Sequence, residues 1–329
     1  MTKPYEAYVL ESTGTREDRS AHIEAMLNSC GACILGAGDF YVSGIKMPKA
    51  TTLSGMGAAT RLILIPEVES GSAVYMSALC KVSSMSLVGC EGQTSIPAAL
   101  GERCGVAYIG TATHEIFSGQ PLNLIIDGLF ISGFSGGGIY CKDTGYSTSA
   151  SITAANCHIF NCGVGIYIPH FSEYHEFTNM LCASNLFGCI NNGGNNVFLN
   201  CGFNSNKTAF VIDNTNNKSI NNSHGSAIGC TFNHSDRNQG IGIHLIGASV
   251  GYVFSGCQVF YSKIILENSK NAVFTGINFG RNTEIKVSGG ELCMFNGCAF
   301  MEPPFIEVKD NDRVKFINCY SASGDEVTA

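Results

Sequence analysis

Carboxylate, imidazole and phenol side chains gather in and beside four polar stretches of the chain, at residues 141–150, 169–174, 191–196 and 213–223. A glycoside hydrolase needs two carboxyl groups about 5 to 9.5 Å apart, one as acid and the other as base or nucleophile. The candidate catalytic residues are therefore the four carboxylates of this region, Asp143, Glu173, Glu176 and Asp213. The candidate substrate-binding residues are its aromatic and imidazole side chains, Tyr146, His170, Tyr174 and His224.

Other interpretations of these residues remain open. Asp and Asn in loops often bond to their own backbone as turn formers. A separate run, His234-Ser235-Asp236-Arg237, combines a base, a carboxylate and a cation, which would suit a lyase acting on uronates. Such a run is also typical of an exposed loop tip. No Cys/His cluster has metal-ligand spacing, so we expect neither a metal nor a cofactor.

An internal repeat sets the positions of these side chains. Aligned on one apolar anchor, segments of similar pattern recur at intervals of 20 to 29 residues through the second half of the chain, and Asp127-Gly128-Leu129 opens the series. The later anchors are Cys157, Met180, Cys201, Cys230, Cys257, Ile277, Cys298 and Cys319. A repeat of this length predicts a solenoid.

Each repeat predicts two short strands joined by a one-residue bend. The residue before the anchor is Asn or Gly in every repeat, and these residues adopt a positive φ most readily. Alternate residues of a strand point to the same face, so residues two places apart can both face the interior. Equivalent inward residues of successive repeats should then stack on one another inside the solenoid. The column before the bend is predicted to hold Phe177, Phe198, Phe254, Phe274, Phe295 and Phe316.

A third apolar segment follows in each repeat, for example Gly165-Ile166-Tyr167-Ile168 and Phe210-Val211-Ile212. Three strands per repeat predict an all-β fold, a right-handed single-stranded parallel β-helix with three sheets and about ten coils. Residues 17–29 predict a short capping helix with Ile23, Met26 and Leu27 on one face, and Gly31 ends it. The segment from Glu91 to Gln120 is predicted to be a longer insertion.

We expect a single domain over residues 1–329, in which 1–35 form the N-terminal cap and helix and 36–329 form the β-helix coils. The 16 cysteines are expected to be buried thiols, because neighbouring coils about 4.8 Å apart present parallel side chains that suit a disulfide poorly.

The composition of the chain limits the kinds of partner that we expect. The formal net charge is −7 and no basic stripe is present, which excludes a nucleic-acid backbone as the expected partner. No run approaches 18 apolar residues, so we expect no membrane partner. The first 14 residues carry charges and no apolar core, which predicts the absence of a signal peptide and a cytoplasmic location or a phage or prophage particle.

The stretch that follows the predicted helix, "ILGAGDFYVSGIKMPKATTLSGMGAATRLIL", resembles the opening of pectate-lyase superfamily proteins found in phage tailspikes and polysaccharide-degrading enzymes. In that family a strand of the pattern Leu-Pro-x-Gly-x-Tyr-x-Val follows a helix, and a Leu-x-Gly-x-Gly turn comes soon after; here Gly36 stands at the Pro position. The resemblance implies the β-helix fold, a carbohydrate partner and a homotrimer. The adjacent aspartates of polygalacturonases and the Arg-x-Pro-x-x-Arg segment of pectate lyases are missing, so no catalytic residue is carried over.

These observations together predict a carbohydrate-active protein that degrades a polysaccharide or oligosaccharide as a glycosidase. A polysaccharide lyase is the second expectation. A non-catalytic carbohydrate-binding protein, or a structural phage-tail or adhesin-like β-helix, is the third. Paired carboxylates favour the enzyme, whereas binding alone would depend more on aromatic side chains.

Overall fold

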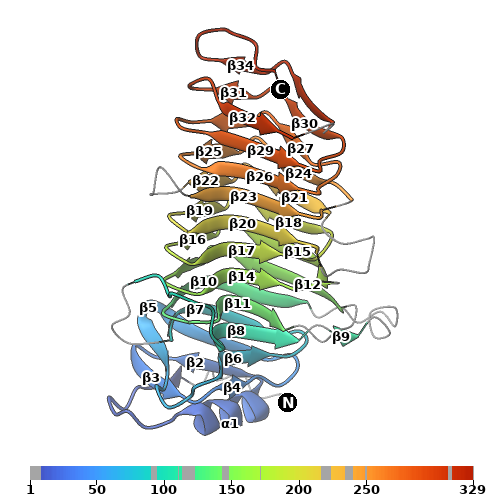
Figure 1. Ribbon diagram of the computed structural model, residues 1–329. Helices are drawn as coiled ribbons and strands as arrows, with labels where there is room; N and C mark the ends of the chain where they lie inside the picture. The colour runs from blue at the N-terminus through green and yellow to red at the C-terminus, as the bar shows by residue number, and fades with distance from the viewer. Residues whose placement is uncertain are drawn as a thin grey trace.

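The computed structural model describes residues 9–89, 95–109, 111–112, 123–142, 148–170, 172–215, 224–233, 240–248, 250–309 and 313–328. Strands from successive coils stack in parallel ladders along the whole molecule, and helix α1 lies at the N-terminal end (Figure 1). One sheet has 23 strands and contains the first two ladders; the other has 11 strands and is the third ladder. The predicted all-β, parallel β-helix with three strands per coil is confirmed.

The first and second ladders are continuous with each other because three early strands run through both. These are β5 (Thr52–Leu64), β7 (Lys81–Val88) and β10 (Leu124–Ser132). The first ladder continues with β12 (Thr148–Ala155), β15 (Ser172–Thr178), β18 (Asn196–Leu199), β21 (Gly225–Ile228), β24 (Tyr252–Ser255), β27 (Val273–Thr275), β30 (Cys293–Asn296) and β33 (Val314–Ile317). The second continues with β13 (His158–Phe160), β16 (Leu181–Ala183), β19 (Gly202–Asn204), β22 (Thr231–Asn233), β25 (Gln258–Phe260), β28 (Asn278–Phe279), β31 (Ala299–Phe300) and β34 (Tyr320–Ser321).

The third ladder forms the remaining side of the coils. Its strands are β4 (Ile45–Lys46), β6 (Gly71–Met76), β8 (Arg103–Ile109), β11 (Gly137–Lys142), β14 (Val164–Ile168), β17 (Phe187–Asn191), β20 (Thr208–Asp213), β23 (Ile241–Ile246), β26 (Lys263–Glu267), β29 (Glu284–Ser288) and β32 (Phe305–Val308). Strand β8 pairs with β6 and β11, and it falls inside the segment predicted to be an insertion. That prediction is therefore wrong for 103–109, which complete a regular coil.

The bend between the first and second ladders is a single residue with left-handed backbone geometry in each coil. All nine predicted positions from Gly128 to Asn318 have a φ between 52° and 63°. Asn and Gly tolerate this conformation best, so the position at which they recur in the sequence predicts the position of the bend.

Stacked aromatic rings fill the interior. Phe274 lies between Phe254 and Phe295, with ring centroids 4.9 and 4.6 Å away and almost parallel planes. Ala227 interrupts this column, and Phe210 from the third ladder packs edge-on against the flanking rings at that level. The apolar core is continuous from the helix to the C-terminal coils.

The anchor cysteines combine packing with weak hydrogen bonds between coils. Cys298 donates its thiol to the carbonyl of Phe274 at 3.5 Å, and Cys319 donates to Phe295 at 3.4 Å. Fifteen cysteines are free thiols and all of these except Cys30 are buried, while Cys90 lies outside the described residues. The prediction of unbridged thiols is confirmed for the fifteen.

Helix α1 (Ser20–Cys30) closes the first coil, with Ile23 and Leu27 fully buried, and Gly31 ends it with a φ of 73°. The helix begins three residues later than predicted. The reason is that the Asp18 carboxylate accepts hydrogen bonds from the backbone N–H groups of Ser20 and Ser43. It therefore connects the chain before the helix to the segment that follows β3 (Gly38–Val42).

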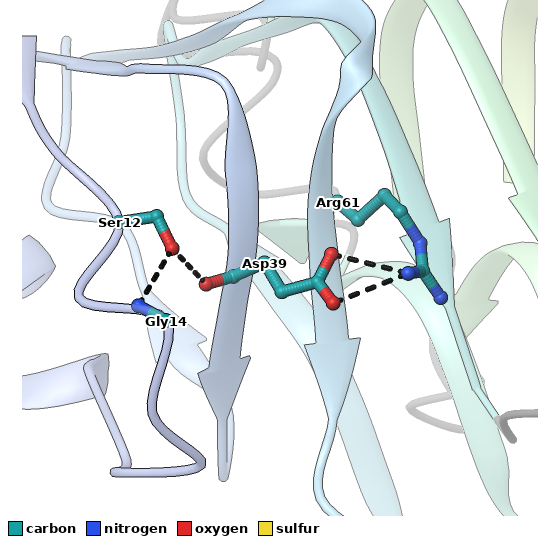
Figure 2. Close-up of polar contacts among 4 residues, drawn as sticks. All are labelled: Ser12, Gly14, Asp39 and Arg61. Carbon is teal, nitrogen blue, oxygen red and sulfur yellow. Dashed lines mark hydrogen bonds and ion pairs between the residues drawn. The ribbon is translucent and has the colours of Figure 1, made fainter.

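Polar contacts connect the first described segment to the same end of the solenoid. Figure 2 shows Arg61 of β5 paired with both carboxylate oxygens of Asp39 on β3 (Gly38–Val42), at 3.1 and 3.2 Å. The Ser12 hydroxyl donates to the Asp39 carbonyl at 2.8 Å and accepts from the Gly14 N–H at 3.2 Å (Figure 2). These contacts position the strands more than they stabilise them, because exposed ion pairs contribute about 0 to 1 kcal/mol.

Candidate functional site

Three of the candidate residues lie on the outer face of one strand, β15. Glu173 is half-buried, Tyr174 is 55% exposed and Glu176 is exposed. The Glu173 carboxylate accepts a hydrogen bond from the Asn195 side-chain amide of the next coil at 3.2 Å. This strand therefore brings two carboxylates and a phenol to one surface.

The backbone at Tyr174 makes this clustering possible. In a regular strand the neighbours Glu173 and Tyr174 would face opposite sides. Tyr174 instead has a φ of 63°, so both side chains point outward and His175 is the next residue to face the core. A left-handed tyrosine is uncommon, and such strained residues concentrate at functional sites.

A surface groove of about 400 Å³ runs beside these residues on the first ladder. Glu176 and Tyr174 form one side, and Thr153, Ile152, Ile125, Leu124 and Asn123 of the preceding coils form the rest. Thr153 is paired in register with Glu176, and Ile125 with Thr153. The groove therefore combines a carboxylate and a phenol with apolar walls.

A buried polar network supports the start of β15 from inside. The Ser172 hydroxyl and His175 Nε2 are 2.8 Å apart, and the His175 backbone N–H donates to the Asn196 side chain at 2.9 Å. Asn196 in turn donates to Asn191 Oδ1 at 2.8 Å. Burial lowers the pKa of His175 to about 3, so the imidazole is neutral at physiological pH. The network fixes the backbone on which Glu173 and Tyr174 are presented.

The other predicted residues are placed more loosely around this strand. His170 lies in the turn that leads into β15, and His224 directly precedes β21, two coils further on. The Asp213 carboxylate accepts from the Thr215 N–H at 3.0 Å and from the Thr215 hydroxyl at 2.7 Å, which is the arrangement of a turn former. Asp143 and Tyr146 lie outside the described residues, as does the run from His234 to Arg237.

Two kinds of feature are absent from the described part of the chain. Within it, no group of three His, Cys, Asp or Glu side chains is arranged to hold a metal ion. No helix of the described residues is long and apolar enough to cross a membrane.

The sequence did not reveal a second group of aromatic residues, on the outer face of the third ladder. Tyr140 stacks on Tyr167 with ring centroids 4.6 Å apart, and Tyr75 lies in the same column of the ladder. Tyr140 occupies the same outward position as Tyr167, one coil earlier. Aligning the third segment of the preceding repeat with Gly165-Ile166-Tyr167-Ile168 would have found it.

The chain is a right-handed parallel β-helix, and its similarities to known proteins are similarities of this fold. Neither a known protein family nor a curated protein sequence matches it. Among solved structures, the A-module of the mannuronan C-5 epimerase AlgE4 of Azotobacter vinelandii is similar, with 13% identity and a TM-score of 0.54 over 96% of this chain and 94% of that module.

Two further structures share the architecture. The enzymatically active domain of tailspike protein 2 of bacteriophage CBA120 has 15% identity and a TM-score of 0.61 over 96% of this chain, which spans about half (47%) of that one. The catalytic domain of a GH87 alpha-1,3-glucanase in complex with nigerose has 12% identity and a TM-score of 0.60, over 98% of this chain and 65% of that domain. Identities this low establish the fold alone.

Proposed function

We propose that this protein binds a polysaccharide and hydrolyses its glycosidic bonds at the groove on the outer face of β15. The observation that carries the proposal is the left-handed Tyr174, because it turns Glu173 to the same outer face as Tyr174 and Glu176, the two residues of this strand that line the groove. The names of the similar structures, an epimerase of mannuronan, a glucanase and a tailspike, support a carbohydrate partner.

The two glutamates have distinct surroundings that suit distinct roles. Glu173 is held by the Asn195 amide, so it is oriented as a nucleophile or base must be. Glu176 lines the open groove, where it can reach a glycosidic oxygen as the acid. Tyr174 offers a ring face to the sugar, and His170 and His224 flank the same edge. Asp143 and Asp213 remain alternative partner carboxylates; Asp213 is two coils from Glu173, about 10 Å along the axis.

Reducing-sugar release from a panel that includes alpha-1,3-glucan and mannuronan tests the proposal. Glu173→Gln and Glu176→Gln should each lower the rate by about 10²- to 10⁴-fold, while the melting temperature stays unchanged. Glu67→Gln, at an exposed position far from the groove, is the matched control and should keep full activity.

The same assay separates the rival functions. Products with the ultraviolet absorbance of unsaturated uronates would identify a lyase. Binding without any product would identify a carbohydrate-binding protein. Full activity in Asp143, Glu173, Glu176 and Asp213 variants alike would show that the catalytic groove lies elsewhere.

The proposal includes a homotrimer carried on a phage particle. An outward column of the first ladder contains Val197, Ser226, Val253, Val273 and Met294, of which Val253 is 39% exposed and the others are half-buried. Exposed apolar stripes are typical of partner surfaces. Sedimentation equilibrium should give three times the chain mass, and Val253→Asp should reduce it; a monomer at micromolar concentration would contradict the assembly.

A further inference from the structure

A second hollow lies on the outer face of the third ladder, in the coils near the N-terminal end. Its volume is about 430 Å³, within the range of about 300 to 1,000 Å³ that is usual for small-molecule sites. Tyr75, Tyr140 and Lys142 line it together with Glu102 and Ser70. None of these residues belongs to the groove at β15.

The register of the third ladder aligns the two tyrosines that line the hollow. Tyr75 of β6 pairs with Ala107 of β8, and Ala107 pairs with Tyr140 of β11. Two tyrosines therefore point outward from positions about 10 Å apart, which is two strand spacings, on either side of the fully buried Ala107.

The walls of the hollow are held in place before any ligand arrives. The Tyr75 hydroxyl accepts a hydrogen bond from the Ser72 N–H at 2.9 Å, and the Lys142 ammonium lies 4.9 Å from the centroid of the Tyr75 ring. Tyr140 is stacked on Tyr167 at an interplanar angle of 13°. Gly137 lets the Tyr140 ring lie against its own strand, because a Cβ there would come within 2.9 Å of the ring.

We propose that this hollow binds one neutral hexopyranose unit of a polysaccharide. The two phenol rings contribute apolar surface to the hollow, against which the C–H groups of a sugar can pack. Lys142 supplies donors, Glu102 supplies acceptors and Ser70 supplies both, which matches a ring of hydroxyl groups. The formal charges of Lys142 and Glu102 offset each other, so the lining has no net charge and favours a neutral sugar over a uronate. The inference rests on the proposed function only in taking a carbohydrate as the partner.

Calorimetric titration with nigerose and cellobiose, as neutral probes, and with methyl glucuronide, as an acidic probe, tests the inference on the whole chain. A neutral disaccharide should bind at millimolar concentration, and Tyr140→Ala or Lys142→Met should weaken it by about tenfold. Lys142→Met keeps the side-chain stem, so this variant should fold even if Tyr140→Ala does not. Tyr320→Ala, which removes an exposed tyrosine at the other end of the solenoid, should bind like the parent.

Three results would overturn the subsite: no binding of either neutral disaccharide, tighter binding of the glucuronide, or unchanged affinity in both Tyr140→Ala and Lys142→Met. The proposed hydrolase activity is contradicted by a different result from the one that contradicts the subsite. If Glu173→Gln and Glu176→Gln keep full activity while Lys142→Met loses nigerose binding, the subsite stands without that catalytic groove. If the glutamate variants are inactive and the Lys142 variant binds nigerose normally, the catalytic groove stands without this subsite.

Discussion

The Ser172 hydroxyl and His175 Nε2 lie 2.8 Å apart in the core, directly behind the surface that presents Glu173 and Tyr174. His175 is fully buried, and its Nδ1 has no hydrogen-bond partner among the described residues. Protonation of this imidazole would place a charge inside the solenoid, which costs free energy because nothing nearby compensates it. The stability of the candidate site is therefore coupled to pH.

Acid should destabilise the protein through His175. Its pKa is about 3 in the folded chain, whereas an unfolded histidine titrates near pH ~6.5. Between these values the unfolded chain binds more protons than the folded one. The free energy of unfolding should therefore fall as the pH drops, by up to about 1.4 kcal/mol per unit. Denaturant titrations across this window should show a shallower dependence for His175→Gln. His22→Gln, at an exposed helix position, should behave like the parent, and identical slopes in all three proteins would contradict the argument.

Replacement of Tyr174 by glycine should separate stability from binding. The left-handed conformation costs an L-residue about 1 to 2 kcal/mol, and glycine adopts it freely. Tyr174→Gly should therefore keep or raise the free energy of unfolding, by up to about 1 kcal/mol, while polysaccharide affinity falls by about tenfold. Tyr320→Gly is the control, since Tyr320 is 48% exposed on a strand without a positive φ and should be destabilised. A clear loss of stability in Tyr174→Gly would show that the tyrosine side chain itself supports the fold.

The Phe column should be the most sensitive part of the interior. Phe274→Ala removes a fully buried ring stacked on both sides, so we expect a loss of about 3 to 5 kcal/mol in the free energy of unfolding. Val273→Ala, on the outer side of the same strand, should cost less than about 1 kcal/mol. Equal losses at the two positions would mean that the solenoid tolerates cavities by local collapse.

The cysteines should be unreactive until the chain unfolds. Burial raises the pKa of Cys157 and of Cys162 to about 12, so almost no thiolate is present at neutral pH. Thiol titration with an aromatic disulfide should modify Cys30, which is half-buried, well before the fourteen buried cysteines. Denaturant should expose all of them. Fast modification of several thiols in the native protein would show that the coils open readily.

The solenoid could be predicted from the sequence because its constraints repeat at every coil. Gly128, Asn156 and Gly256 occupy the same left-handed bend, and Phe254 and Phe274 the same interior position, so each coil shows the pattern again. Prediction from the repeat fails where the length of a coil differs from that of the others. The strand at 103–109 was missed because its sequence intervals from 71–76 and to 137–142 are longer than the 20 to 29 residues of the later repeats.

The coil, its inward columns and the edge with polar residues could be predicted from the amino-acid pattern, because side-chain alternation and glycine or asparagine bends are local properties of the chain. Which of those residues share a surface depends on the folded structure. The left-handed φ of Tyr174 turns Glu173 outward, and no local rule predicts that for a tyrosine. The hollow lined by Tyr75 and Tyr140 likewise depends on the register in which β6, β8 and β11 stack. Contacts between coils depend on the register of stacking, which distant segments fix together.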